Sequence, residues 1–181
     1  MNPGSLLIAD PSVIGDNNFH RSIILLVEHD HNGSFGFIIN NPLNYTTNDI
    51  TIEMEYDFPL YYGGPVDQEN LFFVHKMGDL IPNSVQIQND LYWGGDFKKT
   101  ISLVNNKQLN INDIKFFLGY SGWSPNQLNS EIESKSWIVK KNSNSSEIFR
   151  TKSKSLWSKK MKELGGDFIL WSNSPENPYE N

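Results

Sequence analysis

The sequence predicts a single domain of the α+β class. Apolar runs typical of strands are mixed along the chain with few and short helical patterns. The 181 residues are within the size of one domain, and neither an internal repeat nor a long linker divides them. We therefore expect one domain over residues 1–171. A tail rich in Ser, Asn, Pro and Glu follows at 172–181, and we expect it to be frayed.

Residues 23–39 have the pattern of a β-hairpin. The continuous apolar run Ile23–Val27 is typical of a strand that is covered on both faces. Asp30-His31-Asn32-Gly33 supplies the turn, because Asn-Gly is a strong hairpin signal. Phe35–Ile39 returns as the second strand. Gly36 within it indicates a bulge or the close approach of another backbone.

The middle of the chain predicts two more buried strands with a short helix between them. The strands are Leu71–Val74, which follows the turn Gly63-Gly64-Pro65, and Ile114–Leu118. The helix covers Asp96–Val104, where apolar residues recur on one side and Asp96 can cap the N-terminus.

The strand at Ile114–Leu118 leads into Gly119-Tyr120-Ser121-Gly122-Trp123, which we expect to be a glycine-hinged turn carrying two aromatic side chains. A helix follows at about 125–134. Ser124 can cap this helix, and Gln127 completes a reciprocal capping box. Such a junction would present free backbone N–H groups beside aromatic rings.

The last third of the chain predicts three more strands and one helix. The strands lie near Trp137–Val139, Ile148–Phe149 and Asp167–Trp171. The helix covers about Ser153–Leu164, where apolar residues recur at helical spacing, and Gly165-Gly166 ends it.

Composition limits the class of protein. A hydrophobic content of 38% and an aromatic content of 13% suit a globular chain. The sequence has no cysteine, which excludes disulfides, thiolate metal sites and cysteine nucleophiles. It shows no signal-peptide pattern, and no run approaches the roughly 20 apolar residues of a membrane span. We therefore expect a cytoplasmic protein with no membrane partner and no cofactor.

Charge is distributed unevenly along the chain. The formal net charge is -6, yet residues 135–162 hold nine basic side chains and a single acid, Glu147. One interpretation is a patch for nucleic acid. Its candidate residues are Lys152, Lys154, Lys159, Lys160 and Lys162. The other interpretation is a solvated face whose charge is offset by the acidic remainder. The acidic net charge favours this second interpretation, because it repels phosphate backbones at long range.

The sequence contains no pattern that identifies a reaction. Gly119–Trp123 begins like the nucleophile elbow G-x-S-x-G, but Trp123 stands at the last glycine and all four histidines precede Ser121. His29 and His31 could share a divalent ion, and His75 follows an apolar strand. Ordinary turn and edge positions explain these histidines better. We assign no catalytic residue and no metal ligand.

Several blocks taken together resemble the YqgE/AlgH family of small bacterial proteins. They are, in order, Gly4–Ala9 with Pro11, Phe19–Ser22, Glu28-His29, Gly33–Asn40 with Pro42, Gly63–Val66, Val74-His75, Gly119–Trp123, Gln127-Leu128, Glu131 and Trp137. The resemblance covers residues 4 to about 165. Ser121 stands where the family usually shows alanine, so the family's activity cannot depend on this hydroxyl.

The resemblance implies a specific architecture. The fold would be a bifurcated mixed β-sheet, part of it rolled into a small closed barrel, with helices outside. The family has no established enzymatic activity. Some members carry the label of transcriptional regulator, from a link to alginate production, but this sequence shows no helix-turn-helix pattern.

Three functional hypotheses follow. We favour a non-enzymatic binding or regulatory protein that holds a partner protein or a small ligand at a surface with Tyr120 and Trp123 as anchors. The residues of this surface are Gly63, Gly64, Pro65, Gly119, Tyr120, Gly122, Trp123 and Gln127. One alternative is direct nucleic-acid binding through residues 135–162. The other is an unrecognised hydrolase or metal-dependent enzyme that uses His29, His31 or His75.

Overall fold

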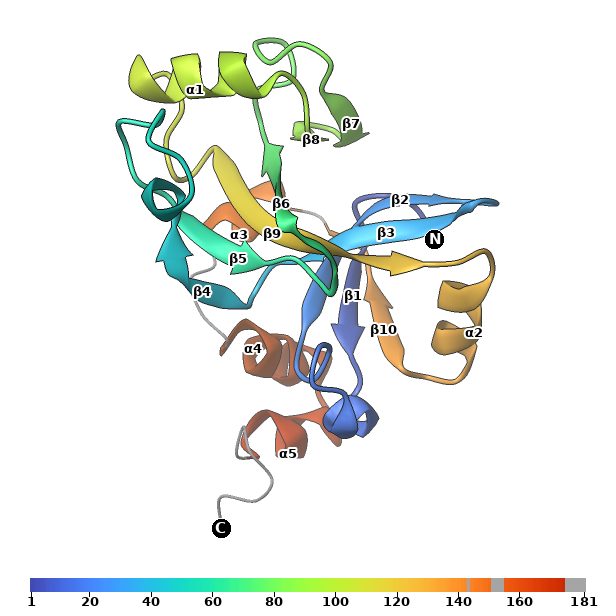
Figure 1. Cartoon of the computed structure of the whole chain (residues 1–181). Coiled ribbons are helices and arrows are strands. Elements are labelled where there is room, and N and C mark those ends of the chain that lie inside the picture. The colour runs from blue at the N-terminus through green and yellow to red at the C-terminus, as the bar shows by residue number, and fades with distance from the viewer. Residues whose placement is uncertain (143, 151–154, 175–181) are drawn as a thin grey trace.

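The described residues form one branched sheet of ten strands (Figure 1). The computed structural model describes residues 1–142, 144–150 and 155–174. The strands are β1 Leu6–Ala9, β2 Ile23–Asp30, β3 Gly33–Ile38, β4 Pro42–Thr46, β5 Pro59–Tyr62, β6 Val66–His75, β7 Val85–Gln88, β8 Leu91–Trp93, β9 Ile114–Trp123 and β10 Trp137–Lys140. The main path runs β10-β1-β2-β3-β9-β6-β8-β7, and β4 and β5 branch from it.

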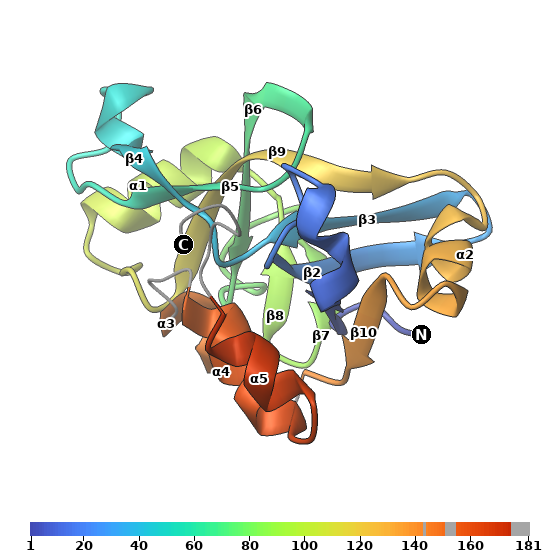
Figure 2. The ribbon, with the colours of Figure 1, turned by 90° about the horizontal axis from the view of Figure 1, so that it is seen from below.

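The sheet divides at β9. The first half of β9 pairs in parallel with β5 on one edge and antiparallel with β6 on the other. Its last residues pair instead with β3, where Phe35 lies opposite Gly122. Figure 2 shows β3 and β9 side by side along this part of the sheet. The predicted α+β fold with a bifurcated mixed sheet is therefore confirmed.

The small closed barrel that the resemblance implied is not formed by the described strands. β10 and β7 are the two ends of the main path, and they are not paired with each other. One side-chain hydrogen bond links the end of β7 to the segment after β10: the Gln88 amide donates to the Asn142 carbonyl oxygen at 3.2 Å. A sheet closes through a backbone ladder between its end strands, so this sheet stays open.

Five α-helices and two short 3₁₀ helices surround the sheet in the described part of the chain. They are α1 Phe97–Asn105, α2 Gln127–Glu133, α3 Ser145–Arg150, α4 Ser155–Leu164 and α5 Phe168–Ser172, with 3₁₀ helices at Pro11–Gly15 and Thr47–Asp49. Figure 1 shows α1 at the end that holds β7 and β8, and α4 and α5 at the opposite end. None of the described helices has the length and apolar character that a bilayer crossing requires.

The hairpin of β2 and β3 confirms the prediction for residues 23–39. Alternate residues of Ile23–Val27 enter two different core clusters, so the strand is covered on both faces. The register shifts between Leu26 and Glu28, across from Gly36. A Cβ on Gly36 would lie 2.3 Å from the Leu25 carbonyl oxygen, so this position combines a bulge with a close backbone approach.

Two helices begin and end largely as the sequence predicts. The Asp96 carboxylate caps α1 by accepting the Lys99 backbone N–H at 3.0 Å. α4 buries Leu156, Trp157 and Met161. Residues 153 and 154, which we expected at its start, lie outside the described residues, as do residues 175–181 of the predicted tail.

Two predicted strands are helices. Ile148 and Phe149 belong to α3, and most of Asp167–Trp171 belongs to α5. Runs of two to five apolar residues fit a helical turn as well as a strand, and periodicity alone does not separate them. Ile148 and Phe149 of α3 are both buried. Gly165-Gly166, with positive φ at both residues, reverses the chain so that α5 packs on α4.

The segment Gly119–Trp123 is strand rather than the predicted turn. β9 continues through Trp123, and α2 begins at Gln127 with Asn126 as its N-cap in the left-handed conformation. One half of the predicted capping box is present, because Gln127 Oε1 accepts the Ser124 N–H at 3.0 Å. Pairing with β3 keeps the segment extended. The prediction of a turn that offers free N–H groups was therefore wrong.

Candidate functional site

The two glycine motifs of the predicted surface are in backbone contact. A Cβ on Gly64 would lie 2.3 Å from the Tyr120 carbonyl, and one on Gly119 would lie 2.5 Å from the Gly64 oxygen. The Gly63 N–H donates to the Leu118 carbonyl oxygen at 2.8 Å. Glycine at these positions lets the connection between β5 and β6 cross β9 closely.

Ser121 lies in this crossing and is fully buried. Its hydroxyl donates to the Gly63 carbonyl oxygen at 3.1 Å. The side chain therefore joins β9 to the loop before β6, which is a structural use of the hydroxyl.

Tyr120 and Trp123 lie on opposite faces of the sheet. They are three residues apart on one strand, so their side chains point in opposite directions. The Trp123 indole is only 6% exposed, packs in a core cluster with Trp137, and stacks against Phe19. Tyr120 is half-buried on the other face, against Phe35 and Phe72. The two aromatic anchors of the predicted surface therefore do not form a pair.

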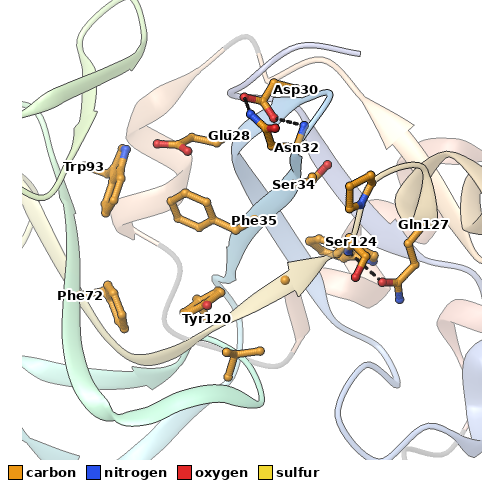
Figure 3. A pocket seen from close by; sticks show the side chains of 15 residues that line it. Glu28, Asp30, Asn32, Ser34, Phe35, Phe72, Trp93, Tyr120, Ser124 and Gln127 are labelled. Carbon is orange, nitrogen blue, oxygen red and sulfur yellow. Dashed lines mark hydrogen bonds between the residues drawn. The ribbon is translucent and has the colours of Figure 1, made fainter.

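A cavity of about 730 Å³ opens on the Tyr120 face (Figure 3). The β2–β3 hairpin, the end of β9, β6 and β8 contribute to its walls. Tyr120, Gly122, Trp123 and Gln127 of the predicted surface line it, although the Trp123 indole is packed in the core cluster on the other face. The described lining does not include Gly63, Gly64, Pro65 or Gly119, which lie at the strand crossing.

Four half-buried rings from four strands form the apolar part of the cavity. They are Phe35, Phe72, Trp93 and Tyr120. Phe35 meets the Trp93 ring edge to face at a centroid distance of 4.9 Å and the Tyr120 ring at 5.7 Å. Phe72 meets Tyr120 at 5.6 Å in the same manner. These contacts fix the rings against one another while one side of the group stays open.

Gly122 explains why the cavity is open at this point. It lies directly opposite Phe35 in the ladder between β3 and β9. A Cβ there would lie 3.1 Å from the Tyr120 ring, so a side chain would crowd this ring and occupy the hollow.

The rim of the cavity is polar. Glu28 and Asp30 from the end of β2 are exposed and line it, as do Asn32 and Ser34. Asp30 accepts the Asn32 backbone N–H at 2.7 Å, which orders the hairpin tip. Figure 3 shows the Glu28 side chain extending from β2 toward the side of the hollow where Trp93 lies.

Trp93 carries an unsatisfied donor at the cavity wall. Its indole Nε1 is buried and has no hydrogen-bond partner among the described residues. A buried donor without a partner costs about 1–3 kcal/mol relative to one that is satisfied. The atom is covered in this structure, so an acceptor from outside the chain would remove this cost only when the side chains that cover the N–H move aside.

None of the four histidines lines the cavity in the part of the chain that the structure describes. His75 is fully buried, and its Nδ1 accepts the Met77 N–H at 3.1 Å while Nε2 faces the Gly94 oxygen at 3.0 Å. Burial lowers the pKa of His75 to about 4, so the ring is neutral near pH 7. His29 Nδ1 lies 2.7 Å from Ser34 Oγ, and His31 is exposed. No group of three or more His, Cys, Asp or Glu side chains within the described ranges could hold a metal ion.

The predicted basic patch is partly neutralised. Lys159 and Lys160 of α4 form ion pairs with Glu147 of α3 at 3.3 and 2.7 Å. Lys160 also contacts Glu163 at 3.1 Å. Lys162 is exposed in the last turn of α4. Lys152 and Lys154 lie outside the described residues.

Sequence reasoning missed most of the cavity. Glu28, Phe35, Phe72 and Trp93 were not singled out. Glu28 and Phe35 are paired in the predicted hairpin, but Phe72 and Trp93 lie on strands distant from it in sequence, and only the sheet order brings them to it. One signal was present. Phe35 and Phe37 flank Gly36, and in a strand such alternate rings share one face.

Comparison with known sequences identifies the relatives of this chain. A family model described as AlgH-like (DUF179) matches residues 6–169. A UPF0301 protein of Cytophaga hutchinsonii is 39% identical over 180 residues, covering 98% of both chains. A UPF0301 protein of Chlorobaculum parvum is 38% identical and covers 98% of this chain and 95% of its own length.

Two solved structures share the fold. The crystal structure of protein DIP2367 from Corynebacterium diphtheriae has a TM-score of 0.75 at 24% identity, covering 96% of this chain and 93% of its own. The solution structure of the AlgH protein from Pseudomonas aeruginosa has a TM-score of 0.74 at 21% identity, covering 96% and 94%. The family match over nearly the whole sequence, together with these identities, shows that the chain belongs to the AlgH-like family.

Proposed function

We propose that this protein is a non-enzymatic binding protein that takes a small ligand in the cavity beside Tyr120 and acts in regulation through that ligand. The observation that carries the proposal is the set of four half-buried rings facing a hollow of about 730 Å³. Small-molecule sites in proteins have volumes of roughly 300–1,000 Å³ and are lined by such rings with a few polar groups.

The positions of Ser121 and His75, two side chains of types often used in catalysis, support a binding role for the cavity. The Ser121 hydroxyl is bonded within the strand crossing, and the His75 imidazole is held between Met77 and Gly94. Both groups are fully buried, and neither lines the cavity among its described residues. What the cavity offers is ring faces and carboxylates, together with the Trp93 N–H once the side chains that cover it move, and these are groups for recognition.

A regulatory effect has a physical route in this fold. Phe35, Gly122, Phe72 and Tyr120 lie on β3, β6 and β9. β9 is shared by the two parts of the sheet, one with β10, β1, β2 and β3 and the other with β4 to β8. A ligand that contacts all of these residues stabilises one arrangement of the strands, and such a preference is what shifts a conformational equilibrium.

Binding is tested by titrating the ¹⁵N-labelled protein with a panel of small organic cations, anions and neutral compounds. We expect at least one class to move the signals of Phe35, Gly122 and the Trp93 indole N–H. The Trp93→Phe variant, which keeps a ring but removes the indole donor, should bind that compound about tenfold more weakly. Trp171→Phe, an exposed position on α5, is the matched control and should bind as the wild type does. No binding from the panel, or shifts confined to other regions, would contradict the proposal.

A further inference from the structure

We propose that the ligand of this cavity is a small organic cation with an alkyl-substituted ammonium group. This inference rests on the proposed function and adds the chemical class of the ligand. Three features of the cavity point to it: the charge of the rim, the aromatic wall, and the unsatisfied indole N–H.

The charged side chains that line the rim are all acidic. Glu28 and Asp30 are exposed carboxylates, and the described lining contains no Lys, Arg or His. Outside the cavity, the sequence up to residue 134 holds a large excess of acidic over basic side chains. The field at the mouth therefore attracts a cation and repels phosphates and carboxylates.

The wall suits a weakly hydrated cation. The face of an aromatic ring carries negative potential, and four rings gather here. Among the described residues, no close cation–ring contact involves any of these four rings. The close contacts between a Lys or Arg and an aromatic ring in the described residues are made by rings outside the cavity, namely Trp157, Phe149, Tyr56 and Tyr61. The cavity rings are thus available to a cation that comes from solution.

The same features disfavour a metal ion. Hard divalent cations take about six to eight oxygen ligands, or several tightly held waters, whereas this cavity offers two exposed carboxylates beside apolar rings. A substituted ammonium is larger, loses its water more easily and buries methyl groups against the rings. The Trp93 N–H adds the need for an acceptor, so the cation should also carry an oxygen.

Choline is the probe that combines these properties, and 3,3-dimethylbutan-1-ol is its neutral isostere. We expect choline to shift the Trp93 indole and Phe35 signals, and to bind about tenfold more tightly than the isostere. Tetramethylammonium, which has the charge but no oxygen, should bind with intermediate affinity. Acetate should not bind.

Variants separate the charge from the rings. Glu28→Gln should weaken choline binding about fivefold and leave the isostere unchanged, because the exposed carboxylate acts on charge alone. Glu69→Gln, an exposed site on β6 outside the described lining, is its matched control. Phe35→Leu keeps an apolar side chain but removes one ring face, so it should weaken choline more than the isostere. A ¹⁵N spectrum like that of the wild type shows that this variant is folded.

The outcomes judge the ligand class and the binding function separately. If choline and its isostere bind equally, or if Glu28→Gln and Glu69→Gln bind choline equally, the cationic class is wrong. If choline and tetramethylammonium fail to bind while another class in the panel moves the cavity signals, the cationic class is again wrong and the binding function stands. If no compound moves those signals, both are wrong.

Discussion

His75 and Lys115 are buried bases on β6 and β9. Lys115 Nζ donates to the carbonyl oxygens of Ile39 and Ile148 at 2.7 and 3.0 Å, and lies 3.7 Å from the centre of the Tyr61 ring. Burial lowers the pKa of Lys115 to about 7 and that of His75 to about 4. In both cases the unfolded chain holds the proton more tightly than the folded chain. For each group, stability therefore rises with pH between its pKa in the folded chain and its pKa in the unfolded chain.

For His75 this difference predicts a loss of stability in mild acid. The unfolded chain takes up a proton as the pH falls below 6.5, while the folded chain does not until about pH 4. The free energy of unfolding should therefore fall over this range, by on the order of 3 kcal/mol from this group. Urea unfolding at pH 7, 6, 5 and 4.5 measures it.

The His75→Gln variant provides the comparison for this measurement. The amide can donate and accept as the neutral ring does, but it takes up no proton. The variant should be less stable than the wild type at pH 7, and the gap should narrow toward pH 4.5. His20, His29 and His31 are present in both proteins and cancel. Parallel pH profiles would show that His75 is not the group responsible.

At the scale of elements, α2 is tied to the sheet by one carboxylate. Glu131 Oε2 accepts the indole N–H groups of Trp123 on β9 and Trp137 on β10 at 2.8 and 2.7 Å. Its Oε1 accepts the Gln127 amide at 3.0 Å. The two rings are buried, so both donors depend on this one acceptor.

Replacing Glu131 with Gln should destabilise the protein by about 1–3 kcal/mol, because a neutral amide oxygen is a weaker acceptor and its NH₂ group cannot accept. Glu133→Gln, an exposed site on the same helix, should change the free energy of unfolding by less than about 0.5 kcal/mol. Urea unfolding at pH 7 compares the two. Equal effects would mean that the link to the tryptophans adds no stability.

The elements also show what sequence can predict. The β2–β3 hairpin and α1 follow from local signals, which are the Asn-Gly turn and the Asp96 cap. Such signals can be recognised in a single sequence. The helical state of Ile148–Phe149 depends on burial against distant strands, which short apolar runs do not reveal. The opposite faces of Tyr120 and Trp123 depend on β9 continuing past Gly119, and its pairing with β3 decides this. The cavity could not be predicted from local signals, because its walls come from strands that only the order of the sheet brings together.

For the whole molecule, β9 is the strand on which both parts of the fold depend. It pairs with β3 of one part and with β5 and β6 of the other. The core cluster around Phe116 packs on its first half, and the cluster around Trp123 packs at its end. Because the two parts share this strand, we expect them to unfold together in one cooperative transition.

Gly64 tests this dependence, because it lies where the chain crosses β9. Its φ is +150°, and a Cβ would lie 2.3 Å from the Tyr120 carbonyl, which is backbone and cannot move aside without displacing the strand. Gly64→Ala should lower the free energy of unfolding by about 2–5 kcal/mol through backbone strain and steric overlap. The matched control is Gly15→Ala, where φ is not positive and nothing lies within 4 Å of the added Cβ, so stability should change little.

Urea unfolding of the Gly64→Ala variant, followed by tryptophan fluorescence and far-ultraviolet circular dichroism, measures both the loss and its cooperativity. The tryptophans report mainly on the part with β3 and β10, and circular dichroism reports on the whole chain. Coincident transitions at a lower urea midpoint are expected, because displacement of Tyr120 disturbs β9 for both parts at once. Two separate transitions would show that the parts fold independently. A midpoint equal to that of Gly15→Ala would show that the crossing tolerates a side chain and that β9 is not held there.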